Sequence, residues 1–158
     1  MSKRIIFSGP SGVAAVIIPA YNDKLTGIRL GESEETYVAR VIARNIEVGV
    51  ISSATTYKIV DETAIPVDRT FRMAWKFDLS VDMAKAREIW RDKMRTVRKV
   101  KFAILDAQAA KASDENDAVE QGRVALARKA LRDVTTHPGI DAAATPKELK
   151  LVWPSILD

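Results

Sequence analysis

The chain has no cysteine and only one histidine among its 158 residues. Without cysteine, it has no disulfide framework, no thiolate nucleophile and no cysteine-ligated zinc site. It also lacks long hydrophobic runs, because the apolar stretches at residues 5–7 and 13–18 end after three and six residues. Such runs are too short for a secretory signal core or a membrane span. We therefore expect a soluble protein, made in a reducing cytoplasm, with no membrane segment.

The overall composition is that of an ordinary globular protein. Hydrophobic residues make up 47% of the chain and charged residues 29%, close to the usual values for soluble domains. The length suits one domain, or one small domain with an extension. The net charge of +4 is mildly basic, and it informs about partners only where the charge is concentrated.

Residues 1–66 have the pattern of a small β-rich module. Short β-branched runs at 4–7 and 13–18 are separated by a Ser-Gly-Pro-Ser-Gly stretch, which favours a turn and therefore a β-hairpin. A third strand is predicted at 57–60. Between these strands, a helix is predicted from about Ser33, with two glutamates placed favourably in its first turn. Its inward side chains would be Tyr37, Val41 and Ile42.

The remainder of the chain divides into three further segments. Residues 67–81 follow a proline break and form a connector rich in aromatic and arginine side chains. Residues 82–136 are predicted to be an antiparallel helical hairpin, divided by a polar turn at 113–117. Residues 137–158 form a tail with a short helix near 146–151, because Thr145, Pro146 and Glu148 match a capping box. The predicted fold class is therefore α+β: a small N-terminal β-rich module with one helix, followed by a C-terminal antiparallel helical hairpin.

Apolar residues in the predicted hairpin recur at three- and four-residue spacing. This spacing predicts which helix faces pack together, and it permits association with a second copy of the chain. On the first helix the predicted inward stripe is Met83, Ala86, Trp90, Val97, Val100, Ile104 and Ala107, and on the second it is Val119, Leu126, Ala130 and Val134.

No pattern in the sequence is typical of an enzyme. We therefore predict that the protein is not an enzyme and that it binds no cofactor and no metal. His137 stands beside a proline at a helix stop, with no nucleophile or orienting group marked for it. The Gly9–Gly12 stretch lacks the lysine of a phosphate-binding loop and is predicted to be a hairpin loop. The polar turn after residue 113 resembles a calcium loop only in part, because alanine and valine occupy its fifth and sixth positions.

Basic residues are concentrated on the first predicted long helix. They could contact nucleic-acid phosphates, so a small basic DNA-binding protein is one alternative. They are spread around the helix, however, and charge complementarity within the hairpin or with an acidic protein explains them equally well. The residues concerned are Lys85, Arg87, Arg91, Lys93, Arg95, Arg98, Lys99 and Lys101.

Several short segments occur in a specific order: YKIVD at 57–61, DRTFRMAW at 68–75, KAREIWRDKMR at 85–95, KALRD at 129–133 and AAATPKEL at 142–149. Together, over about residues 55–154, they resemble a family of proteins encoded beside tail-fibre genes in tailed bacteriophages, the tail assembly chaperone or tail-fibre assembly-like proteins.

The resemblance implies a non-enzymatic tail protein that binds tail-fibre or baseplate proteins. It would be present in the host cytoplasm during assembly. It would act either as a structural component that remains in the virion tail, or as a transient chaperone that is absent from the particle. The candidate partner-binding side chains are Arg69, Phe71, Arg72, Trp75, Trp90 and Trp153, since aromatic and arginine residues dominate binding hot spots.

A structural role for the 68–78 segment is the alternative. Phe71 and Trp75 would then pack against the helical hairpin as an inter-domain cluster. Arg69 and Arg72 would pair with acidic neighbours such as Asp68 and Asp78.

Overall fold

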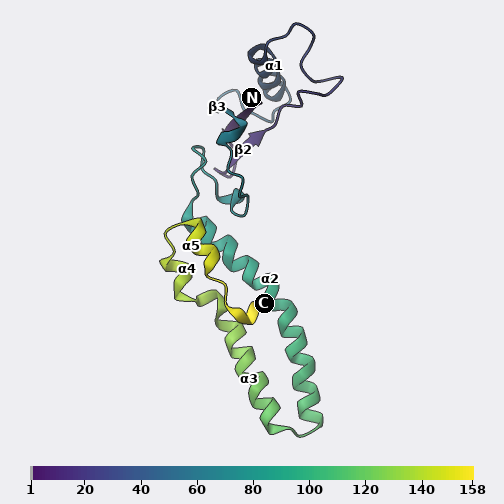
Figure 1. Ribbon diagram of the computed structural model, residues 1–158, viewed down its shortest axis with the longest axis vertical. Coiled ribbons are helices and arrows are strands. Elements are labelled where there is room, and N and C mark those ends of the chain that lie inside the picture. The colour runs from purple at the N-terminus through teal and green to yellow at the C-terminus, as the bar shows by residue number, and fades with distance from the viewer. Residues whose placement is uncertain (1) are drawn as a thin grey trace. The chain divides into compact units, whose positions relative to one another are not determined.

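The computed structural model describes residues 2–158 (Figure 1). The chain has a mixed α+β fold, 54% helical and 11% strand, with a small antiparallel sheet followed by helices. The predicted fold class is therefore confirmed. The chain divides into two compact units, Met1–Asp82 and Met83–Asp158, which we call the first and the second unit.

The first unit contains three strands, β1 (Lys3–Ser8), β2 (Ala14–Ile17) and β3 (Tyr57–Asp61). They hydrogen-bond in the order β2-β1-β3, with antiparallel pairing on both sides of β1. The loop between β1 and β2 turns at Gly12, whose φ of 71° lies in the left-handed region that glycine adopts without strain. The predicted hairpin, its loop and the third strand are all confirmed.

Helix α1 (Glu34–Glu47) covers one face of this sheet. It begins where it was predicted, because the hydroxyl of Ser33 accepts a hydrogen bond from the backbone N–H of Thr36 and so satisfies a free helical donor. Of the predicted inward side chains, Tyr37 and Ile42 are buried and Val41 is half-buried. The core on this side consists of Ile5, Phe7, Val38, Ile42 and Ile51.

The segment after β3 covers the opposite face of the sheet. Because successive strand residues point to opposite faces, Ile6 faces away from α1 and packs with Ala14 and Trp75. Phe77, Leu79 and Val81 pack around this cluster. Two short 3-10 helices lie in this part of the chain, η1 (Glu62–Ala64) and η2 (Arg72–Ala74). Trp75 is therefore part of the core of the first unit.

The second unit is dominated by α2 (Met83–Asp114) and α3 (Ala118–Asp133). The two helices are antiparallel. Asp106 of α2 accepts a hydrogen bond from Arg128 of α3, whereas Gln108, further along α2, accepts one from Arg123, which lies earlier in α3. The polar turn was predicted correctly, and Asp117 caps α3 by accepting from two backbone N–H groups. The helical hairpin is visible in Figure 1.

The predicted packing face of α2 is correct at the start of the helix, where Ala86 and Trp90 are buried, but it is wrong further along α2 and over most of α3. Val100 is 64% exposed and Val119 is 85% exposed, and Ala107, Ile104, Leu126 and Ala130 are exposed as well. Met94 and Ala112 are instead the buried residues of α2 beyond Trp90, and Val124 and Leu131 are those of α3. Arginine and lysine side chains can lay their apolar stems on a contact face while their charged ends reach water or a carbonyl. A stripe counted from apolar residues alone therefore misplaced the face, although Val134 is buried as predicted.

The tail folds onto the start of α2. It contains η3 (Val134–Thr136), α4 (Pro138–Ala142), α5 (Pro146–Leu151) and η4 (Ser155–Leu157). Helix α5 has the predicted bounds, and the hydroxyl of Thr145 accepts from the backbone N–H of Glu148. His137 accepts a hydrogen bond from Gly139 at the start of α4, which confirms the helix-terminal role predicted for it.

Candidate functional site

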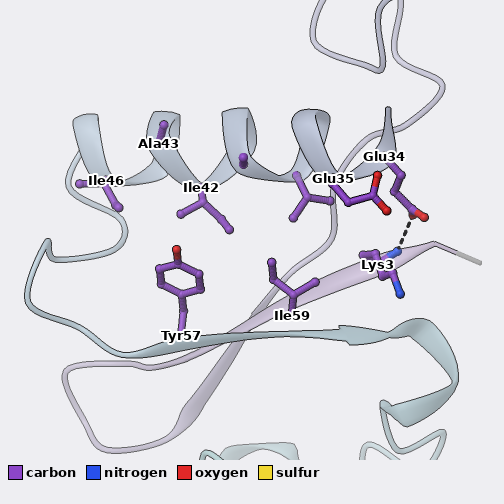
Figure 2. A pocket seen from close by; sticks show the side chains of 10 residues that line it. Lys3, Glu34, Glu35, Ile42, Ala43, Ile46, Tyr57 and Ile59 are labelled. Atoms are coloured by element: carbon purple, nitrogen blue, oxygen red, sulfur yellow. Dashed lines mark hydrogen bonds between the residues drawn. The ribbon is translucent and has the colours of Figure 1, made fainter. Parts of the chain in front are cut away.

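An open apolar groove lies between α1 and β3 in the first unit (Figure 2). It has a volume of about 390 Å³. Tyr57 and Ile59, which point from β3 toward α1, are 41% and 49% exposed, although they are large apolar side chains. The groove is lined by Val38, Ala39, Ile42, Ala43 and Ile46 of α1, Tyr57 and Ile59 of β3, and Lys3, Glu34 and Glu35.

Charged groups gather at one end of the groove. The backbone N–H of Lys3 donates to the carboxylate of Glu34 at 3.2 Å and to the hydroxyl of Tyr21 at 2.8 Å. Its ammonium group pairs with Asp61 at 2.8 Å. The hydrogen bond and charge of Asp61 raise the pKa of Lys3. This end is therefore held by polar contacts, while Ile46 and Tyr57 form the apolar opposite end (Figure 2).

The outer edge of β3 borders the same groove. No strand pairs with β3 on the side away from β1 in the part of the chain that the structure describes. An edge strand presents backbone donors and acceptors to other chains. An apolar groove beside such an edge is suited to contacts with a protein chain.

The sequence predicted β3 but not the groove. The sequence does show that side chains alternate between the two faces of the strand in Tyr57-Lys58-Ile59-Val60. This alternation places Tyr57 and Ile59 on the same face. What the sequence did not reveal is that β3 would be an edge strand.

The predicted site residues at 69–75 fall into two groups. Phe71 and Trp75 are 2% and 4% exposed, whereas Arg69 and Arg72 are exposed. Both arginines line a cavity of about 240 Å³ together with Trp75. The two aromatic side chains are thus core residues, and the two arginines are on the surface.

The ion pairs predicted for these arginines are not present. Neither Arg69 nor Arg72 pairs with a carboxylate within residues 2–158. Asp78 instead accepts hydrogen bonds from the N–H and hydroxyl of Ser80, which hold the pKa of that carboxyl below its usual value. Asp68 accepts in the same way from Thr70. These aspartates are therefore occupied by local turns.

Trp90 and Trp153, the remaining predicted site residues, meet in the second unit. Their ring centroids are 5.3 Å apart in an edge-to-face arrangement. The ammonium group of Lys93 lies 4.6 Å from the ring centroid of Trp90 and 5.3 Å from that of Trp153, distances that suit a cation–π contact. Trp90 is buried and Trp153 is half-buried.

The basic residues of α2 are largely engaged within the second unit. Lys101 donates to the backbone carbonyl of Asp158. The arginines act as links to the tail, to α3 and to carboxylates of α2 itself. Their hydrogen bonds join Arg87 to the carbonyls of Ile140 and Ala143, Arg91 to Glu88 and Asp141, Arg95 to Asp92, and Arg98 to the carbonyl of Arg132.

Residues 2–158 contain no grouping of acidic, histidine or cysteine side chains that would hold a metal ion. Among these residues, no helix has the length and apolar character needed to cross a membrane. A scan of protein-family models and searches of curated proteins and of solved structures give no match to this chain.

Proposed function

We propose that this chain is a non-enzymatic tail protein of a tailed bacteriophage that acts by binding tail-fibre or baseplate proteins. The observation that carries the protein-binding part is the apolar groove beside the open edge of β3. Large apolar side chains that remain half exposed around a groove are typical of surfaces that another protein covers. The assignment to a phage tail is supported by the order of the DRTFRMAW segment at 68–75 and its neighbouring segments in the sequence.

Direct binding to purified tail-fibre and baseplate proteins of the same phage tests this function. The wild-type chain should bind at least one of them. Ile59→Ser, which removes an apolar contact in the groove, should weaken that binding by about tenfold or more, the effect of losing a well-packed interface side chain. Leu30→Ser is the matched control, because Leu30 is fully exposed and lies outside the groove.

Two roles remain within this function, a structural virion component and a transient assembly chaperone. Mass spectrometry of purified particles, with the copy number measured against the major tail protein, separates them. A stoichiometric signal supports the structural role. A protein abundant in infected cells but absent from particles is a chaperone. Absence of binding to every fibre and baseplate protein would contradict the proposal in both forms.

A further inference from the structure

The outer edge of β2 carries backbone groups that point away from the sheet. The backbone N–H of Ala14 donates to the carbonyl of Trp75 at 2.8 Å, so the backbone of Ala14 faces away from β1. Successive residues of an antiparallel strand alternate in the direction of their backbone groups. The N–H and C=O of Val16 therefore point outward like those of Ala14. No further strand pairs with this edge within residues 2–158.

Two adjacent cavities lie along this edge. Their volumes are about 240 and 260 Å³, and both are lined by Val16, Ile18, Ile65 and Arg69. Ile18 is 56% exposed although it is a large apolar residue. The outward backbone of Val16 thus opens onto a surface whose floor is apolar.

The charge at this surface is positive. Arg4, which lines one cavity, is buried and paired with Glu62 at 2.6 Å, so these two charges offset one another. Arg69 and Arg72 are exposed and have no ion pair in the described part of the chain. Arginine side chains hold carboxylates through paired N–H donors. Two such side chains therefore stand beside an open strand edge and an apolar floor.

We propose that the β2 edge binds a short extended segment of a partner protein that carries apolar and acidic side chains on the same face, at every second residue. The segment adds to the sheet as a strand by hydrogen-bonding to the outward N–H and C=O of Val16. Its apolar side chains cover Ile18 and Ile65, and its carboxylates contact Arg69 and Arg72. The proposal deepens the protein-binding function proposed above by naming a second surface and the chemistry of its partner.

Nucleic acid fits this surface less well. A phosphate backbone would satisfy the arginines but would leave the outward C=O of Val16 and the apolar floor without matching groups. A second copy of the chain could bind here only if it presented an exposed strand that carries both acidic and apolar side chains. The strand edges β2 and β3 carry Ala-Ala-Val-Ile and Tyr-Lys-Ile-Val-Asp, and the only carboxylate among them, that of Asp61, is paired with Lys3.

The test is a titration of the full chain with the synthetic peptide Val-Ser-Asp-Ser-Val-Ser-Asp, whose valines and aspartates lie on one face of an extended strand. Binding is followed by amide NMR and by fluorescence anisotropy. The amide signal of Val16 should shift on binding. Arg69→Gln with Arg72→Gln should weaken the affinity by about tenfold or more, as expected when charge-assisted hydrogen bonds are lost. Lys76→Gln, which removes an exposed positive charge outside the cavities, should leave the affinity unchanged.

Val16→Pro tests strand addition separately from charge. Proline is tolerated where a strand's N–H faces outward at a sheet edge, yet it removes that donor. The variant should keep the wild-type melting temperature within a few degrees and lose peptide binding. If it fails to fold, a peptide methylated at its central backbone nitrogens provides the same test from the partner's side, and it should not bind.

Each of the following results would overturn the inference: no binding of the aspartate peptide at millimolar concentration, equal binding of a lysine-containing peptide or of oligo-dT, unchanged affinity in the double arginine variant, or unchanged binding of the backbone-methylated peptide. These results leave the groove at β3 untouched. Fibre or baseplate binding that depends on Ile59 but not on Arg69 and Arg72 would therefore retain the proposed function and reject this inference alone.

Discussion

The indole N–H of Trp90 donates a hydrogen bond to the backbone carbonyl of Val152, 2.8 Å away. Trp90 lies near the start of α2 and is 4% exposed, whereas Val152 directly follows α5. The bond therefore fastens the C-terminal tail to the long helix. The edge-to-face contact with Trp153 adds to the same junction.

Trp90→Ala should destabilise the second unit by about 3–5 kcal/mol, the usual cost of deleting a large buried aromatic side chain. The substitution removes the packing of the ring, its contact with Trp153 and the bond to Val152. Chemical denaturation followed by circular dichroism measures the difference in unfolding free energy. A thermal midpoint that falls by less than about 2 °C would show that Trp90 is not a core residue.

Two variants serve as controls for this measurement. Trp90→Phe keeps an aromatic ring but loses the indole donor, so it should cost less than Trp90→Ala. Val119→Ala changes a residue that is 85% exposed, and it should change stability by no more than about 0.5 kcal/mol.

Arg87→Met should destabilise the second unit by about 1.5–3 kcal/mol. The guanidinium of Arg87 donates to the carbonyls of Ile140 at 3.2 Å and Ala143 at 2.9 Å. Hydrogen bonds to charged groups contribute about this much, and their loss leaves the carbonyls at the end of α4 without these donors. Hydrogen exchange of α4 should become faster. Lys99→Met is the matched control, because Lys99 is exposed on the same helix; an equal loss in both variants would contradict the prediction.

Features fixed by neighbouring residues were predictable from the sequence. The cap at Ser33, the turn that Asp117 closes and the start of α5 at Thr145 all depend on a side-chain oxygen that reaches an N–H two or three residues away. The hairpin of β1 and β2 likewise follows from a short glycine-containing loop. Such contacts are specified within a few residues, so local patterns reveal them.

Features that depend on distant segments were not predictable in the same way. The packing face of α2 includes Arg98 and Lys101, whose charged ends reach carbonyls of Arg132 and Asp158, so apolar spacing alone placed the face wrongly. Trp75 packs on a sheet formed by residues far from it in the chain. The groove at Tyr57 and Ile59 likewise exists only because β3 is an edge strand.

Two glycine substitutions should have opposite effects. Gly27→Ala should destabilise the first unit by about 1–3 kcal/mol, the cost of overpacking, because a Cβ atom there would lie 2.3 Å from the carbonyl oxygen of Asp23. Gly122→Ala should stabilise the second unit by about 0.5–1 kcal/mol, since it lies within α3 and its Cβ would meet open space. Thermal melts of the two variants against the wild type measure both effects. A Gly27→Ala protein more stable than the wild type would contradict the close approach of the Asp23 backbone to Gly27.

The pairing of Glu32 with Arg40 should make the stability of the first unit depend on acid pH. The guanidinium of Arg40 donates to both carboxylate oxygens of Glu32, at 2.9 and 2.8 Å. These bonds, with one from the backbone of Arg29, lower the pKa of Glu32 from 4.5 to about 2. The carboxylate is thus favoured in the folded state. Its contribution to stability is complete above pH 4.5 and is lost as the pH falls toward 2.

Glu32→Gln isolates this effect from other carboxylates with lowered pKa, such as Asp61 beside Lys3. The wild type should be more stable than Glu32→Gln at pH 7, and the difference should shrink between pH 4.5 and 2. Denaturant midpoints measured at each pH provide the comparison. Glu47→Gln removes an exposed pair with Arg44 and should show little difference at any pH, because exposed ion pairs contribute little. A wild-type advantage over Glu32→Gln that stays constant from pH 7 to 2 would show that the stabilisation does not come from the ionised carboxylate.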